Sequence, residues 1–236
     1  MTTSEDAAPS PRPSAFKNAA RIQQSFSARA ERRALLWLAE RMPRWVNSDH
    51  LTILGFISML LVGASYAFAR WNRAGLMLAT FFLALNWFGD SLDGTLARVR
   101  NCQRPRYGFY VDHIVDSFGA LFLMAGLAIS GYADWRIAAG LLVAFLMLSI
   151  EVYLAVYTMG AFHMSFWRFG PTELRILLAL ANTALWLRGN FRVFGSRYTL
   201  FDVGGSVGIA GMAVMLIIST ISHTRTLYRE ETLPST

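Results

Sequence analysis

The sequence predicts an all-α integral membrane protein, a six-transmembrane-helix bundle preceded by an amphipathic helix beside the membrane. Of its 236 residues, 54% are hydrophobic, and the apolar residues gather into long runs. A helix that crosses a bilayer needs about 20 apolar residues, and soluble domains rarely carry several such stretches. We therefore expect one helical membrane domain, with no room for a second folded unit.

Two segments of different composition precede the first apolar segment. Residues 1–14 are rich in Ser, Pro, Ala and charges, which predicts a disordered tail. No uninterrupted apolar core of signal-peptide type is present. Residues 15–46 alternate apolar side chains with arginines, a pattern typical of a helix lying on anionic headgroups. The alternative is a solvated helix packed on the bundle.

Six apolar segments follow, and they define a membrane domain over residues 47–224 with a C-terminal tail at 225–236. The predicted spans are 51–69, 74–97, 108–131, 135–159, 171–187 and 204–222. The third and fourth are the clearest, whereas the last two are shorter or Gly-rich. Gly204 and Gly208 form a G-x-x-x-G pattern in the last span, which suits close helix packing or the seam of a homodimer.

The distribution of charge predicts the orientation. An even number of spans puts both termini on one side, where fifteen Lys and Arg would lie, against six on the other. This bias favours cytoplasmic termini. Sparse Lys with abundant Arg and Ala suggests a bacterial source, and hence the inner membrane. The net charge of +7 indicates topology and contact with membrane lipids. It does not indicate a nucleic-acid partner, because aromatic residues do not interleave with the basic ones.

Four aspartates gather at the end of the second span and the start of the third: Asp90, Asp93, Asp112 and Asp116. Spacings of three and four residues place each pair on one helix face, and the Pro-containing linker lets the two helices run antiparallel. A carboxylate inside a membrane is energetically costly, so it is usually paired with another group or has a function. Ligands that offer only oxygen favour Mg²⁺, Mn²⁺ or Ca²⁺ over Zn²⁺. A cation site at the cytoplasmic end of the bundle is expected.

The residues beside the aspartates suit a phosphate ligand. Gly94 follows Asp93 although a helix interior disfavours Gly by about 1 kcal/mol relative to Ala, which suggests that something approaches the backbone closely. Gly108 would serve the same purpose on the next helix. Arg98 is placed to hold a phosphate with its planar fork. Divalent cations beside an arginine describe a site for a polyphosphate.

The pattern has eight fixed positions: Asp90, Asp93, Gly94, Ala97, Arg98, Gly108, Asp112 and Asp116. They match D-x2-D-G-x2-A-R-x8/9-G-x3-D-x3-D, so the chain resembles the CDP-alcohol phosphotransferases. The six spans and the amphipathic N-terminal helix also resemble the layout of that family. The resemblance implies an enzyme of phospholipid biosynthesis. It would transfer a substituted phosphate from a CDP-alcohol donor to an alcohol acceptor and release CMP.

The same resemblance implies roles for the motif residues. The four aspartates would bind metal, usually two ions of Mg²⁺ or Mn²⁺, and Asp116 would also be the general base. Gly94, Ala97, Arg98 and Gly108 would line the pocket for cytidine diphosphate.

One stretch departs from the family pattern. Members often carry Pro-Asn-x-Leu/Ile-Thr at the start of the first span, and here only Leu51 and Thr52 fit. Thr52 is a candidate for contact with the nucleotide. Asp49 occupies the Asn position, where it would contact the nucleotide or metal, or would cap the helix instead.

The motif does not decide whether the donor is CDP-diacylglycerol or a CDP-aminoalcohol. Candidates for binding the acceptor are Glu151, Arg168, Glu173 and Arg175, since charges inside a membrane often mark a site. Each also has a structural alternative. Glu151 would hydrogen-bond a neighbouring helix, Glu173 and Arg175 would cap a helix near the interface, and Arg168 would follow the positive-inside bias.

A different function class is a divalent-cation transporter or sensor that uses the same acidic cluster. Transporters place charged or unwound elements near the midplane and often contain inverted repeats. Here the cluster lies at one membrane face and no repeat is found. These observations favour the enzyme.

Overall fold

The computed structural model describes residues 28–159, 171–188 and 199–231, and within these ranges every regular element is an α-helix. The helices are α1 (Ala28–Arg41), α2 (Ser48–Ala69), α3 (Ala74–Val99), α4 (Pro105–Ser130), α5 (Trp135–Met159), α6 (Pro171–Arg188) and α7 (Leu200–Glu230). The predicted all-helical class is thus confirmed for the described part of the chain. The expected tail at 1–14 lies outside it.

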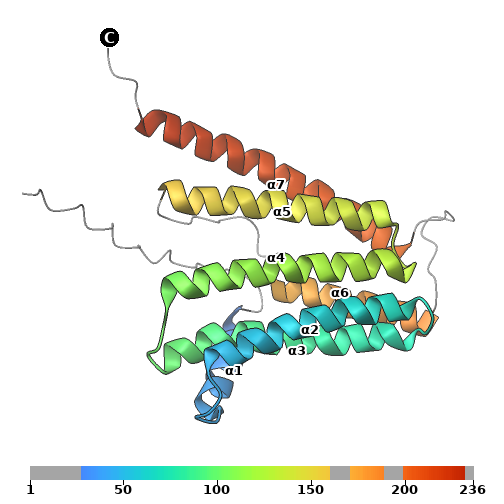
Figure 1. The fold of residues 1–236 in the computed structure, drawn as a ribbon. Helices are drawn as coiled ribbons and strands as arrows, with labels where there is room; N and C mark the ends of the chain where they lie inside the picture. The colour runs from blue at the N-terminus through green and yellow to red at the C-terminus, as the bar shows by residue number, and fades with distance from the viewer. Residues whose placement is uncertain (1–27, 160–170, 189–198, 232–236) are drawn as a thin grey trace, which may run out of the picture.

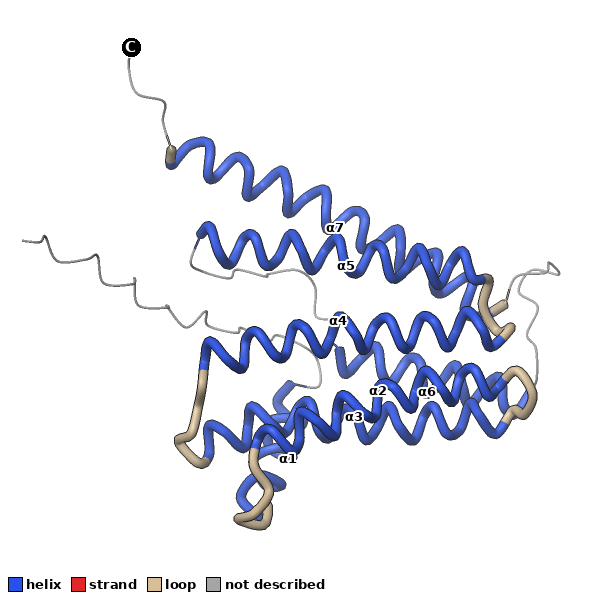
Figure 2. Tube along the Cα trace, viewed as in Figure 1, coloured by secondary structure: helices blue, strands red, loops and turns tan. Residues whose placement is uncertain are grey.

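The long helices lie side by side as a bundle (Figure 1). In order of packing, α6 contacts α3, α3 contacts α2, α2 contacts α4, α4 contacts α5, and α5 contacts α7. The short α1 packs on α3. The α3–α4 loop and the α1–α2 link lie at the same end of the bundle, opposite the α2–α3 and α4–α5 turns (Figure 2).

Within the described ranges, five helices are long and apolar enough to cross a membrane: α2, α3, α4, α5 and α7. The expected span at 171–187 is also a helix, α6. It has 18 residues, which include Glu173, Arg175 and Arg188, and it is not among the five. Length and composition therefore support five of the six predicted spans.

Within the predicted helix at 15–46, the structure describes residues from 28 onward, and there α1 ends at Arg41. It packs on the bundle through Leu35 and Ala39, which share a buried cluster with Leu92 and Leu96 of α3. Trp37, on the same helix, is 54% exposed. Packing on the bundle, the alternative weighed for this segment, is therefore present, and an exposed apolar side chain remains available to a membrane surface.

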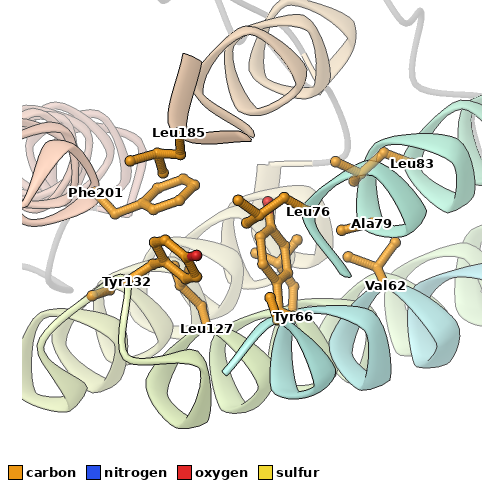
Figure 3. Close-up of a cluster of buried hydrophobic side chains, with 12 residues drawn as sticks. Val62, Tyr66, Leu76, Ala79, Leu83, Leu127, Tyr132, Leu185 and Phe201 are labelled. Carbon is orange, nitrogen blue, oxygen red and sulfur yellow. The ribbon is translucent and has the colours of Figure 1, made fainter. Parts of the chain in front are cut away.

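The largest buried cluster joins α2, α3, α4, α6 and α7 toward the end of the bundle remote from the aspartates (Figure 3). Tyr66 of α2 and Leu185 of α6 are almost fully buried there. The Tyr66 hydroxyl donates to Asn182 Oδ1 at 3.0 Å, and the Asn182 amide donates to Thr80 Oγ1 at 3.1 Å. Two polar bonds thus fasten α6 to α2 and α3 inside an apolar core.

Helices α2 and α4 touch backbone to backbone. A Cβ added to Gly126 of α4 would lie only 2.6 Å from Gly63 Cα of α2. Small residues at such crossings let membrane helices approach closely and gain packing energy. This crossing holds α4 against α2, so that α4 lies closer to α2 than to α3.

The last helix is longer than the predicted span at 204–222. It starts at Leu200, behind a capping box between Thr199 and Asp202, and continues to Glu230. The first residues of the expected tail at 225–236 are therefore helical. Asp202 Oδ1 also accepts the Asp134 N–H at 2.6 Å, which ties the α4–α5 turn to the start of α7.

Candidate active site

All eight motif positions lie in two helices, at the end of the bundle that holds the α3–α4 loop. The first five positions are in the last turns of α3, and the other three begin α4. Pro105 stands in the first turn of α4, where its missing N–H costs nothing. The loop of 100–104 then reverses the chain, as predicted.

Asp93 is held by the start of α2. The Thr52 hydroxyl donates to Asp93 Oδ2 at 2.7 Å, and the Ser48 hydroxyl donates to the Asp93 main-chain oxygen at 3.0 Å. The Gly94 N–H donates to Asp93 Oδ1. Thr52, a candidate for contact with the nucleotide, thus contacts a motif aspartate in this structure.

Asp90 is paired with a residue from the second half of the chain. Arg175 Nη2 of α6 lies 2.6 Å from Asp90 Oδ2, and the two side chains are 16% and 28% exposed. A partly buried, charge-assisted hydrogen bond of this kind is stronger than an exposed ion pair. The structure thus brings one of the predicted acceptor residues directly to the aspartates.

The motif residues of α4 lie farther from Asp93 than Asp90 does. The charges of Asp90 and Asp112 both act on Asp93. However, among the described residues no three Asp, Glu, His or Cys side chains lie close enough to hold one ion. The reason is the packing of α4, which lies against α2 and α5. In this conformation the two halves of the motif stand apart.

The remaining motif residues lie around open space. Arg98 is exposed and donates to Thr95 Oγ1 at 3.0 Å, and Asp116 is exposed. A Cβ on Gly108 would meet nothing within 4 Å, and one on Gly94 would meet only the Arg98 side chain, at 3.5 Å. Among the described residues, only the flexible Arg98 side chain borders the space beside these two glycines, so a ligand can approach the backbone there.

Two of the other candidates, Asp49 and Glu151, contact residues other than the aspartates. Asp49 pairs with Arg104, and the cap of α2 is Asn47, not Asp49. Glu151 Oε1 lies 2.6 Å from His223 Nδ1 of α7, which is the contact with a neighbouring helix weighed as its alternative. Glu173 lies in the first turn of α6. Arg168 falls outside the described residues.

A sequence model of the CDP-alcohol phosphatidyltransferase family matches residues 45–222, about three quarters of the chain. The chain belongs to this family. It is also 33% identical over 104 residues to the archaetidylinositol phosphate synthase of Pyrococcus horikoshii, a match that covers 44% of this chain and 52% of the relative. The match thus spans about half the length of that relative. The family predicted from the motif is confirmed.

The donor set of this CDP-alcohol phosphatidyltransferase suits the divalent metals that its family generally uses. Carboxylate oxygens are the ligands that Mg²⁺ and Mn²⁺ prefer, and the cluster carries more negative charge than the Arg175 contact offsets. The open space beside Gly108 and Gly94 leaves room for the phosphates that would share such ions. The types of side chain present therefore fit divalent metals.

In this family member, two polar residues that the sequence analysis did not single out hold the helices around the site together. Arg100 donates to the main-chain oxygens of Met42 at 3.0 Å and Pro43 at 2.9 Å, and also to that of Val46, which holds the α1–α2 link against the end of α3. Glu31 of α1 accepts hydrogen bonds from α3 and α6. No local pattern signals either role, because the partners are 54 or more residues away.

Proposed function

We propose that the protein is a metal-dependent transferase of phospholipid biosynthesis. It moves a substituted phosphate group from a CDP-linked alcohol to a second alcohol and releases CMP. The observation that carries this proposal is the complete eight-position motif, placed on two adjoining helix ends at one face of the bundle of a family member. The cation transporter or sensor has no observation of its own in its favour.

In the proposed reaction the acceptor hydroxyl oxygen bonds to the phosphorus that carries the donor's alcohol. The bond from this phosphorus to the bridging oxygen of the diphosphate breaks, and CMP leaves with that oxygen and its electron pair. Asp116 takes the proton of the attacking hydroxyl, a role that suits an exposed carboxylate at the mouth of the site. No covalent enzyme intermediate is required.

Asp90, Asp93, Asp112 and Asp116 would hold two ions of Mg²⁺ or Mn²⁺. Bound there, the ions would neutralise the diphosphate and polarise the phosphorus under attack. Thr52 and Ser48 would keep Asp93 in place through the bonds described above. Since the two halves of the motif stand apart, binding ions to all four aspartates would require the start of α4 to lie closer to the end of α3.

The nucleotide would lie over the open surface of the motif. Gly94, Ala97 and Gly108 would admit the diphosphate to the helix backbone, and the exposed Arg98 would hold a phosphate. Asp49 would border this pocket through its ion pair with Arg104.

For the acceptor we propose a phosphorylated polyol, and for the donor a CDP-activated lipid. The name of the Pyrococcus horikoshii relative, archaetidylinositol phosphate synthase, describes a lipid-linked inositol phosphate as its product. Arg175 supports this choice, because its guanidinium already lies against Asp90 and can bind a phosphate with two parallel bonds. Glu173 and Arg168 flank it in sequence, and Glu151 would act from α5.

We further propose that α6 completes six spans and that both termini and the site face the cytoplasm of a bacterial inner membrane. Its 18 residues extend about 27 Å at about 1.5 Å each, close to the thickness of the hydrocarbon core. The exposed face of α1 would meet lipid headgroups. A Cβ on Gly204 would meet none of the described residues, whereas one on Gly208 would lie 3.2 Å from Leu141 of α5, so a homodimer seam on α7 would use the Gly204 end of the pattern.

The test is CMP release by the purified full chain in detergent with Mg²⁺. CDP-diacylglycerol is paired with inositol phosphate, glycerol 3-phosphate, inositol or serine, and CDP-choline or CDP-ethanolamine is paired with diacylglycerol. We expect release with a CDP-lipid and a phosphorylated polyol, its loss in EDTA and its return with Mg²⁺ or Mn²⁺. Release that persists in EDTA would overturn the metal-dependent mechanism. Release with CDP-choline alone would overturn the proposed donor.

A further inference from the structure

Glu31 joins three helices through a single oxygen atom. Its Oε1 accepts the indole N–H of Trp87 of α3 at 2.9 Å and the hydroxyl of Thr172 of α6 at 2.8 Å. Glu31 belongs to α1, the helix predicted to lie at the membrane surface. The carboxylate therefore connects that helix to the two helices that carry Asp90 and Arg175.

The contact lies one helical turn from the Arg175–Asp90 pair on both helices. Thr172 and Arg175 are three residues apart on α6, and Trp87 and Asp90 are three residues apart on α3, so each pair lies on one helix face. Two polar contacts thus hold the first turn of α6 to α3, one direct and one through Glu31. Loosening the contact through Glu31 changes where Arg175 meets Asp90.

The direct contact bears on cation binding. A guanidinium 2.6 Å from Asp90 Oδ2 occupies the oxygen that a bound cation would use, and its positive charge repels that cation. When Arg175 stays on Asp90, the aspartates are partly neutralised and a cation must displace it. When Arg175 leaves, Asp90 becomes free to ligate.

We infer that Glu31 is a positioning residue that restrains cation entry to the aspartates. By holding the first turn of α6 against α3, Glu31 keeps Arg175 on Asp90 until a phosphate-bearing substrate draws Arg175 away. The inference rests on the proposed function, since it takes the aspartates as the cation site. It adds to the proposed function that a contact made by α1 influences the order in which cation and substrate bind.

The chain supplies variants that isolate this bond. Glu31→Ala removes the acceptor, Glu31→Gln keeps an oxygen that can accept both bonds, and Thr172→Val removes one donor at nearly constant shape. Glu40→Ala changes the same residue type at an exposed position near the end of α1 and is the matched control. Helix α1 stays docked in all four, because Leu35 and Ala39 bury against α3 independently.

The experiment measures the dissociation constant of Mn²⁺ by electron paramagnetic resonance on the purified full chain, without substrate. Glu31→Ala and Thr172→Val should each tighten Mn²⁺ binding about three- to tenfold, the range set by the net contribution of one typical intramolecular hydrogen bond. Combining them should add little, because both break the same contact. Glu31→Gln and Glu40→Ala should stay within about twofold of the unmodified chain.

Mn²⁺ binding that is unchanged or weaker in Glu31→Ala would overturn the inference, as would equal effects of Glu31→Ala and Glu40→Ala. Tightening in Glu31→Gln equal to that in Glu31→Ala would also overturn it, because the charge rather than the bond would then be responsible. A chain that binds no Mn²⁺ at all fails the proposed function itself. The two failures are therefore distinct.

Discussion

The close crossing of α2 and α4 gives the sharpest prediction for stability. In Gly126→Ala, the new Cβ would lie 2.6 Å from Gly63 Cα, about 1 Å inside the ordinary carbon–carbon contact distance. The obstacle is backbone, which cannot rotate away, so the two helices must separate. Overpacking of this kind costs about 1–3 kcal/mol. For a chain of this size that corresponds to a fall in Tm of roughly 2–12 °C.

Gly211→Ala in α7 is the matched control. It makes the same substitution inside a helix, but its Cβ meets nothing within 4 Å. Replacing Gly by Ala in a helix interior then gains up to about 1 kcal/mol, so Tm should stay level or rise by roughly 2–4 °C. Circular dichroism during heating in detergent measures both. Equal Tm values for the two variants would refute the reasoning that backbone contact at Gly126 holds α4 in place.

Three further changes test the site and its supports. Asp116→Asn should lower the rate of CMP release about 100-fold or more while Mn²⁺ still binds, and an unchanged rate would remove Asp116 as the base. Arg100→Gln leaves three carbonyls of the α1–α2 link without their donor, so trypsin should cut after Arg44 about 5–30 times faster, with cleavage at Arg70 as the internal control. Tyr66→Phe leaves the buried Asn182 Oδ1 unpaired and should cost about 1 kcal/mol in thermal unfolding; an unchanged Tm would show that this bond contributes nothing.

The helices and the motif could be predicted because both are local patterns. Long apolar runs define the helices, and spacings of three and four residues place Asp90 beside Asp93 and Asp112 beside Asp116 whatever the rest of the chain does. The complete motif also identifies the family. Helix ends were less predictable, since α7 continues through polar residues to Glu230 where hydropathy alone ends the span at 222.

The relative placement of the helices could not be predicted, because it depends on contacts between distant residues. Arg175 meets Asp90 from 85 positions away, and only the packing of α6 on α3 brings them together. The two pairs of aspartates stand apart because Gly63 and Gly126 draw α4 onto α2. No spacing between residues in the sequence predicts how far apart the two pairs of aspartates lie. For Glu151, the sequence left two roles open, and the structure gives it His223.

The pairing of Arg175 with Asp90 also has a consequence for biogenesis. The proposed insertion of α6 into the bilayer would carry Arg175 near the start of a helix that has little apolar length; at a helix centre an arginine costs roughly 2.5–3.5 kcal/mol, and nearer the end it costs less. During synthesis, however, α3 ends at Val99 and α6 starts at Pro171, so Asp90 and Thr80 are already made when α6 emerges. We expect α6 to enter the membrane poorly when its gene segment is expressed alone. It should integrate efficiently once α1–α4 precede it, which makes the first half of the chain an internal assembly aid for the second.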